Sequence, residues 1–226
     1  MSAVERGLQR GMMIIVTLLI PFIILMGGVR GLMTRTFLSV EYNLPWFPAD
    51  PYGFTTQDRL KWAGLTFDYA WSNHSLTFLQ DLRFDDGTPV YNERELSHMQ
   101  DVQNLGQLML RLWYVALIAT ALLGILAWRL KWWQSFRRGV SNGGWLMVGF
   151  VIVVLLGVGV SFNWLFTEFH RLFFQGNTWV FLYSDTLIRL FPLRFWIDVF
   201  VMIGAACLVV GGLLGWFARP RKRTPA

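Results

Sequence analysis

The chain has 226 residues, of which 54% are hydrophobic and 15% are charged, and its formal net charge is +6. This composition, with 12 tryptophans and 19 phenylalanines, excludes an ordinary soluble domain. The positive charge does not indicate nucleic-acid binding, because the lysines and arginines lie at the ends of apolar runs and do not spread over one face. The sequence therefore predicts an α-helical integral membrane protein.

The first apolar run, Gly11–Gly28, follows Arg6 and Arg10 and has Pro21 near its middle. A secretory signal peptide has the same layout. The run is long for a signal, however, and no Ala-x-Ala cleavage site follows it. We therefore expect residues 1–33 to form the N-terminal tail and an uncleaved transmembrane helix, in which neighbouring helices compensate for the backbone bond that the proline removes.

Residues 34–104 form a polar, aromatic insert that is too long for a hairpin turn, so we expect a small extracytoplasmic domain. Clusters of Pro, Asp and Gly at 45–53 and 85–89 indicate turns. Between them, Leu65–Leu79 alternates weakly and is rich in Thr, Phe, Tyr and Trp, which favours short β-strands. His74 lies in this stretch without a charged motif, and we expect it at the surface.

Three further apolar runs complete a predicted bundle of four transmembrane helices. In chain order, the segments after the insert are helix 105–130, cytoplasmic loop 131–143, helix 144–164, extracytoplasmic loop 165–191, helix 192–218 and basic tail 219–226. Within the last helix, Arg194 and Asp198 are spaced i, i+4 and are expected to pair. Cys207, the single cysteine, lies in the same run and is expected to be buried.

Orientation follows from the basic residues. They concentrate in the N-terminal tail, in the loop at 129–138 and in the C-terminal tail. By the positive-inside rule, both termini and this loop are cytoplasmic. The insert and the loop 165–191 then both face the outside, so His98 and His170 lie on the same side of the membrane, each close to a helix end.

Two polar islands interrupt the apolar pattern: Tyr91–Asp101, which reads YNERELSHMQD, and Glu168–Arg171, which reads EFHR. Asn92, three residues before Glu95, forms an Asn variant of the capping box and would start a helix there. That helix would carry His98 near the mouth of a membrane segment. Ionisable groups at a membrane are functional candidates by default, and a histidine can take and return a proton near neutral pH.

Three interpretations compete for His98 and His170. A lone histidine is most often a capping or hydrogen-bonded residue, but two of them in charged motifs facing one compartment favour a reactive site. A metal site is disfavoured because no HExxH-type spacing occurs, although Glu95 and Asp185 could join both histidines in one. A serine or cysteine nucleophile lacks support, since the sequence has no GxSxG elbow.

The two islands resemble the lipoprotein intramolecular transacylase (Lit) family. The residues that carry the likeness are Asn92–Glu95, His98, Asp101, Val102, Phe169, His170, Phe173, Phe174, Trp179, Asp185 and Pro192. The likeness covers nearly the whole chain in the order of its segments. Residues 40–85 match no pattern of the family, which leaves open a relative with a different acyl substrate.

The resemblance implies a multi-pass enzyme of the bacterial inner membrane. Such enzymes move the sn-2 acyl chain of a diacylglyceryl-cysteine lipoprotein to the α-amino group of the same cysteine, and the product is an N-acylated lyso-form lipoprotein. No external acyl donor, cofactor or metal is implied. The expected partners are the lipidated N-terminus of a lipoprotein and membrane lipids. A phospholipid acyltransferase or lipase with the same histidines, and a non-enzymatic lipid-binding protein, are the alternatives.

Matching the motifs residue by residue makes His98 and His170 the expected catalytic pair, at the extracytoplasmic face. One would take the proton of the attacking amine and the other would protonate the leaving glycerol oxygen. The sequence does not assign the base. Because the reaction is intramolecular, alignment of amine and ester can supply effective molarities on the order of 10⁵ M.

Supporting roles fall to the neighbours of the two histidines. Glu95 or Asp101 is the candidate to orient His98, and Arg94 or Asn177 is the candidate to stabilise the oxyanion. Asp185 completes the set of expected supporting residues.

Overall fold

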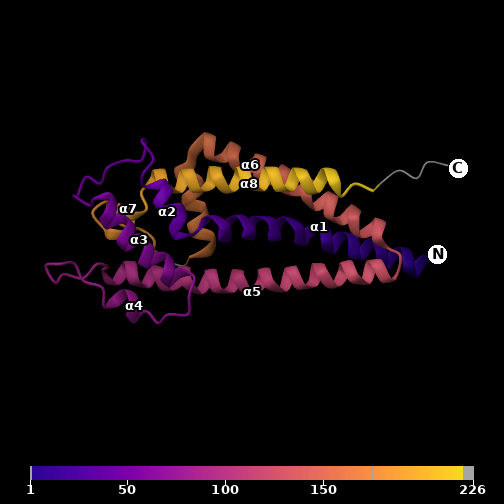
Figure 1. The fold of residues 1–226 in the computed structure, drawn as a ribbon, viewed down its shortest axis with the longest axis horizontal. Helices are drawn as coiled ribbons and strands as arrows, with labels where there is room; N and C mark the ends of the chain where they lie inside the picture. The colour runs from indigo at the N-terminus through magenta and orange to yellow at the C-terminus, as the bar shows by residue number, and fades with distance from the viewer. Residues whose placement is uncertain (1, 175, 221–226) are drawn as a thin grey trace. The chain divides into compact units, whose positions relative to one another are not determined.

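The computed structural model describes residues 2–174 and 176–220 (Figure 1). It is built from helices joined by turns. In chain order they are α1 (Ala3–Leu32), α2 (Arg35–Glu41), α3 (Thr56–Ala70), α4 (Thr77–Gln80), α5 (Glu93–Arg129), α6 (Trp133–Phe173), α7 (Thr186–Leu190) and α8 (Leu193–Phe217).

The predicted β-structure of the insert is wrong. Helices α3 and α4 occupy most of the stretch Leu65–Leu79. A capping box starts α3, in which the Thr55 hydroxyl accepts from the Asp58 amide at 3.1 Å and the Thr55 amide donates to the Asp58 carboxylate at 2.8 Å. In the described part of the chain, the only β-pairing is an isolated bridge between Arg83 and Pro89, around the predicted turn.

Helical spacing explains why the alternation was misleading. The buried residues of α3 recur mainly at intervals of three and four, and they are Arg59, Trp62, Ala63, Gly64, Thr66, Phe67, Tyr69 and Ala70. This is the period of one helix face, whereas a strand would bury every second residue. Aromatic and β-branched residues, which favour strands in isolation, are held in the helix by packing.

The chain divides into two compact units. The first, called the bundle unit here, consists of Met1–Val29, Leu110–Leu156 and Val201–Ala226. The second consists of Arg30–Met109 and Gly157–Phe200, and it is called the histidine unit because it holds all three histidines. All four long helices, α1, α5, α6 and α8, contribute one part to each unit.

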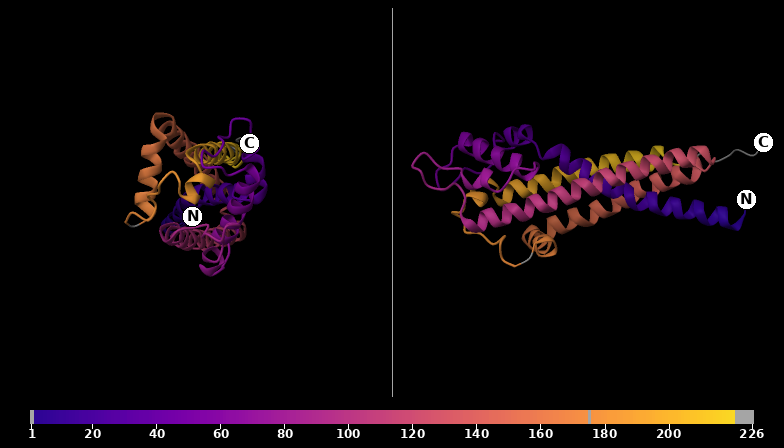
Figure 2. Two further views of the ribbon diagram at one scale, coloured as in Figure 1. Left: turned by 90° about the vertical axis from the view of Figure 1, so that its left-hand side faces the viewer. Right: turned by 90° about the horizontal axis from the view of Figure 1, so that it is seen from below.

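In the bundle unit, segments of α1, α5, α6 and α8 pack lengthwise around one apolar core (Figures 1 and 2). The core residues are Met12, Val16, Ile20, Ile24, Ala127, Met147, Val151 and Cys207. Glycines allow the closest approach, since a Cβ at Gly144 of α6 would lie 2.5 Å from backbone atoms of Gly211 and Gly215 in α8. The burial predicted for Cys207 is confirmed.

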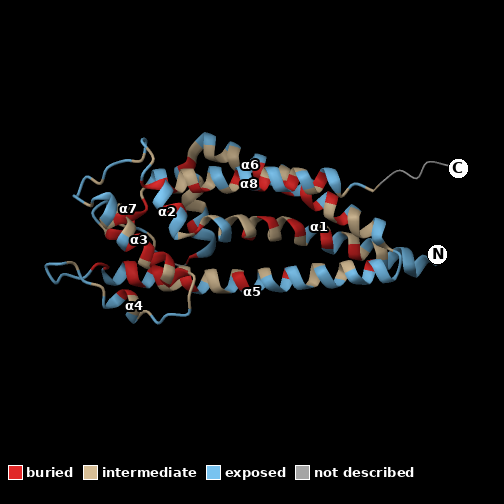
Figure 3. Ribbon diagram, in the orientation of Figure 1, coloured by how far each residue is buried: buried red, intermediate tan, exposed pale blue. Residues whose placement is uncertain are grey.

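Many residues along the helices of the bundle unit are exposed (pale blue in Figure 3), and many of these are large hydrophobic residues. Leu122 and Ile118 are each 60% exposed, and Val153 is 68% exposed. Among the described residues, α1, α5, α6 and α8 are long and apolar enough to cross a membrane. An exposed apolar surface of this extent is unfavourable in water, and it suits the hydrocarbon core of a membrane.

The third long helix extends well beyond its predicted bounds. Helix α6 begins at Trp133, within the predicted loop 131–143, and it continues to Phe173, within the predicted loop 165–191. Ser161, with φ −161° and ψ 96°, interrupts it with extended backbone. The predicted boundaries at 144 and 164 mark the ends of the apolar run. The helix continues through the more polar residues before and after that run.

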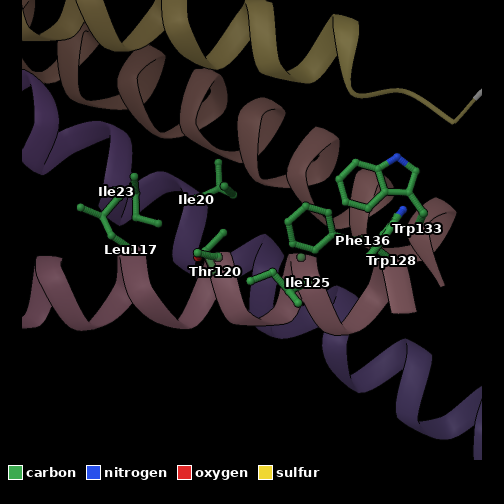
Figure 4. A pocket seen from close by; sticks show the side chains of 10 residues that line it. Ile20, Ile23, Leu117, Thr120, Ile125, Trp128, Trp133 and Phe136 are labelled. Atoms are coloured by element: carbon green, nitrogen blue, oxygen red, sulfur yellow. The ribbon is translucent and has the colours of Figure 1, made fainter. Parts of the chain in front are cut away.

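An apolar groove of about 560 Å³ opens in the bundle unit (Figure 4). Side chains from α1, α5 and the start of α6 line it: Ile20, Ile23, Leu117, Thr120, Ala121, Gly124, Ile125, Trp128, Trp133 and Phe136. Thr120 supplies the one hydroxyl of this lining. The groove therefore suits a hydrocarbon chain better than a polar ligand.

In the histidine unit, hydrogen bonds join α3 and the turn after it to α5 and α7. Gln103 of α5 donates through Nε2 to the carbonyls of Tyr69, Ser72 and His74 at 2.9–3.1 Å, which satisfies backbone acceptors at and beyond the end of α3. Arg59 of α3 donates to the carbonyl of Arg189 in α7 at 3.0 Å. These bonds hold α3, the start of α5 and α7 together, and the first polar island lies at the start of α5.

Candidate functional site

The N-terminus of α5 is built as the sequence predicts. The Asn92 amide donates to a Glu95 carboxylate oxygen at 2.8 Å, and the Glu95 amide donates to the Asn92 side chain at 3.0 Å, so the predicted capping box is confirmed. The second oxygen of Glu95 accepts from the Leu187 amide in the first turn of α7 at 2.7 Å. Glu95, which is 1% exposed, thus anchors the starts of two helices.

The part of α6 after Ser161 is a short helix of its own. Its start is capped by Ser161, whose hydroxyl accepts from the Trp164 amide at 3.3 Å. His170 follows in the last turn of this helix, where its Nδ1 lies 2.8 Å from the Phe166 carbonyl. Because a carbonyl can only accept, Nδ1 carries the proton and the other ring nitrogen, Nε2, is left for other chemistry.

The structure brings His98 of α5 and His170 of α6 together. Their ring centroids are 6.0 Å apart with an interplanar angle of 25°, although 72 positions separate them in the chain. Each residue is 8% exposed. Two imidazoles at this distance can both reach one small reacting group between them.

Aromatic rings enclose the pair. Phe174 and Phe181 lie 5.0 Å and 5.3 Å from the His98 ring, measured between centroids. Phe166 and Trp179 lie 4.1 Å and 5.2 Å from the His170 ring. Apolar surroundings favour the uncharged imidazole over the cation, which is the form that can act as a base.

Two polar atoms of this enclosure have no hydrogen-bond partner among the described residues. They are Nδ1 of His98 and Nε1 of Trp179, and both are shielded from solvent. Buried polar atoms without partners are rare in folded proteins and costly when they occur. Each therefore marks a place where a polar atom of a ligand would be stabilised.

The predicted supporting residues bind the segment that follows α6. Arg94 donates to the Val180 carbonyl at 3.1 Å. Asp101 accepts from the Thr178 hydroxyl at 3.4 Å, and Asp185 accepts from the Asn92 side chain at 3.1 Å. The side chain of Asn177 is exposed, and its carbonyl accepts from the Val180 amide at 3.2 Å.

These contacts change the roles expected of the neighbours. Glu95 and Asp101, the candidates to orient His98, instead hold α7 and the turn at Thr178. Among the residues described, no group of three or more His, Cys, Asp and Glu side chains lies close enough to hold a metal ion.

The comparisons with known proteins address the family. The family model described as "Lipoprotein intramolecular transacylase Lit" matches residues 13–196. The chain belongs to this family. An uncharacterised protein of Aquifex aeolicus (strain VF5) is similar to it, with 28% identity over 203 residues, which span 89% of this chain and 90% of that protein.

Solved structures of the membrane-integral lipoprotein intramolecular transacylase Lit from Bacillus cereus share the fold. One matches with a TM-score of 0.73 and 21% identity, and the match covers 92% of this chain and 93% of that one. A second, of a His-to-Arg variant, matches with a TM-score of 0.70 and 19% identity, over 95% and 92% of the two chains. The fold class is therefore that of a membrane-integral Lit protein with four apolar helices and without the predicted β-structure.

Sequence reasoning overlooked the aromatic enclosure in this Lit-family chain. Phe166 precedes His170 by four residues, so helical spacing alone could have placed its ring and carbonyl beside the imidazole. The sequence around Trp179 does not place it beside a histidine, because tryptophans at the membrane interface are common in membrane proteins. The sequence contains no signal for Phe181, which reaches His98 only through the path of the segment after α6.

Proposed function

We propose that this Lit-family chain moves the sn-2 acyl chain of a diacylglyceryl-cysteine lipoprotein to the α-amino group of that cysteine. The family supports the class of reaction. The observation that carries the proposal is the buried pair of His98 and His170, 6.0 Å apart in an aromatic enclosure. A neutral histidine pair suits a reaction that moves one proton from nitrogen to oxygen and leaves no net charge.

His170 is the base in this proposal. An α-amine has a pKa of about 8, so only about a tenth of it is uncharged at neutral pH, and its nitrogen cannot complete an amide without losing protons. The hydrogen bond from Nδ1 of His170 to the Phe166 carbonyl leaves the lone pair of Nε2 free to accept one. The fixed carbonyl also steadies the imidazolium that forms, as the orienting partner of a catalytic histidine does.

His98 is the acid. The neutral amine attacks the ester carbonyl, a C–N bond forms, and the nitrogen passes a proton to His170. His170 passes this proton to His98, and the C–O bond to glycerol breaks as the protonated His98 donates it to the leaving oxygen. Both rings end in the neutral state. The products are one amide and one free hydroxyl, so atoms and charge balance.

The position of the pair fits a lipid substrate. Basic residues gather in the tails and near the ends of α5 and α6, so the positive-inside rule puts both termini in the cytoplasm and His98 and His170 at the outer face. The lipidated cysteine of a lipoprotein in the bacterial inner membrane lies at that face. Holding amine and ester of one molecule together there supplies much of the rate.

Mass spectrometry of a lipoprotein N-terminus tests the proposal. The chain is expressed in a bacterial host that makes diacylglyceryl lipoproteins, and the N-terminal lipopeptide is analysed. Wild type is expected to give the N-acylated lyso-form, whereas His98→Ala and His170→Ala give unchanged diacyl lipopeptide. His74→Ala is the matched control, because this histidine is exposed and stacks on Phe78.

Two outcomes would count against the proposal. Altered phospholipids with an unchanged lipoprotein would favour a phospholipid acyltransferase or lipase. Full activity of both His98→Ala and His170→Ala would remove the histidines from the chemistry while leaving the reaction class intact.

A further inference from the structure

Trp179 presents a buried hydrogen-bond donor that nothing in the described chain uses. Its Nε1 is shielded from solvent and has no partner. An indole nitrogen can only donate, so it cannot be satisfied by another donor. Leaving such a buried donor unpaired is unfavourable unless a ligand atom completes the bond.

The indole lies directly against the proposed base. Its ring centroid is 5.2 Å from that of His170, with an interplanar angle of 38°. Phe174 contacts both histidines, at 5.0 Å from His98 and 5.5 Å from His170. The ring that carries the unpaired N–H therefore lies in the same enclosure as the two imidazoles.

Charged side chains of α5 hold Trp179 in place from both sides. The residue before it, Thr178, donates to Asp101 at 3.4 Å. The residue after it, Val180, accepts from Arg94 at 3.1 Å and closes a turn by donating to the Asn177 carbonyl at 3.2 Å. Two charged residues thus fix the backbone on either side of one tryptophan, which is more than packing of an aromatic ring requires.

We propose that the Nε1–H of Trp179 donates a hydrogen bond to the acyl carbonyl oxygen as the amine attacks. This inference rests on the proposed transacylation. Negative charge develops on that oxygen in the tetrahedral intermediate, and a prepositioned donor in a dry site stabilises it more than the planar ester. The indole N–H requires no proton transfer and stays uncharged, so it suits an apolar pocket where a guanidinium would be costly.

This assignment replaces the oxyanion donors expected from the sequence. Arg94 uses its guanidinium on the Val180 carbonyl, and the Asn177 side chain is exposed. Arg94 and Asp101 become positioning residues that act through the turn carrying Trp179.

Replacement of the indole nitrogen tests the inference. In purified enzyme, 3-benzothienylalanine is incorporated at position 179, because it keeps the bicyclic shape and lacks the N–H. Trp179→Phe is measured beside it, and Trp164→Phe is the control, since that side chain is 62% exposed. Initial rates on a diacylglyceryl lipopeptide give kcat and KM, and thermal unfolding verifies the fold.

Loss of one oxyanion donor is expected to lower kcat by about 10²–10³-fold with little change in KM. Both Trp179 variants should show this loss, and Trp164→Phe should not. Wild-type kcat in the benzothienyl variant, with a loss only in Trp179→Phe, would overturn the inference and leave a packing role. That result would leave the transacylation standing, whereas absence of lyso-form product from wild type would overturn the transacylation itself.

Discussion

Glu41 provides the sharpest test of the electrostatics of the histidine unit. The residue ends α2 and is 0% exposed, and neither carboxyl oxygen has a hydrogen-bond partner among the described residues. Its carboxyl faces that of Asp198 in α8, which is itself paired with Arg194 at 2.7 Å. Burial, and next the neighbouring carboxyl of Asp198, raise the pKa of Glu41 from 4.5 to about 7.

The raised pKa makes stability depend on pH. Below about pH 4.5 Glu41 is protonated in both the folded and the unfolded chain. Between there and about pH 7 the unfolded chain loses this proton while the folded chain keeps it, so folding stability falls as pH rises. Each pKa unit corresponds to about 1.4 kcal/mol, and the total loss is about 3 kcal/mol.

Glu41→Gln removes this titration and keeps the shape of the side chain. We expect the variant to gain stability relative to wild type as pH rises, by about 2.5 kcal/mol between about pH 5 and about pH 8. For a chain of this size, the gain corresponds to a rise of about 5–10 °C in unfolding midpoint relative to wild type. Tryptophan fluorescence during heating in detergent micelles measures both midpoints at each pH.

The control makes the same chemical change at the surface. Glu93 is exposed in the first turn of α5, and Glu93→Gln should change stability by no more than about 0.5 kcal/mol at either pH. A difference between wild type and Glu41→Gln that stays constant from about pH 5 to about pH 8 would refute the assignment of a protonated carboxyl.

Other predictions follow from close contacts and caps. Gly144→Ala should destabilise the bundle unit by about 1–3 kcal/mol, because the added Cβ would collide with the backbone of α8. Gly149→Ala in the same helix is the control, since its Cβ would meet open space and the change should be neutral or stabilising. Thermal unfolding in detergent compares the two variants. Glu95→Ala removes the cap of α5 and leaves a buried amide of α7 unpaired, so the melting midpoint should fall by the equivalent of about 2–4 kcal/mol. Asp101→Asn should lower kcat by loosening the turn before Trp179 while the midpoint stays within about 1 kcal/mol of wild type, and unchanged kcat would contradict that positioning role.

Features set by neighbouring residues were predictable from the sequence. The capping box of Asn92 and Glu95 needs only three residues of spacing, and the pair of Arg194 and Asp198 needs four; both are confirmed. The four apolar helices follow from composition, because a membrane-crossing helix must satisfy its own backbone and be apolar along its length. The orientation of the chain and the catalytic role of the histidines stay predictions.

Features set by distant packing were not predictable. Helix α3 is an exception, because the capping box of Thr55 and Asp58 is a local signal for a helix, and the strand prediction for Leu65–Leu79 did not use it. The sequence around Glu41 does not indicate that its carboxyl faces Asp198, which is 157 positions away. Likewise, the position of Trp179 depends on two bonds from α5 to a turn that has no regular structure of its own.

The polar island on α5 therefore serves mainly to position the segment that follows α6, and fixed positions suit an intramolecular reaction. One residue of the island, His98, faces His170, while Arg94, Glu95 and Asp101 bind the segment that closes over both rings. An enzyme whose substrate carries both reacting groups gains most from fixed geometry and exclusion of water, since free water would compete with the amine for the ester. The charged residues of α5 hold the segment that carries Trp179 and Phe181, and these aromatic side chains keep water away from the two histidines. Ionisable groups can therefore surround a site whose interior is apolar.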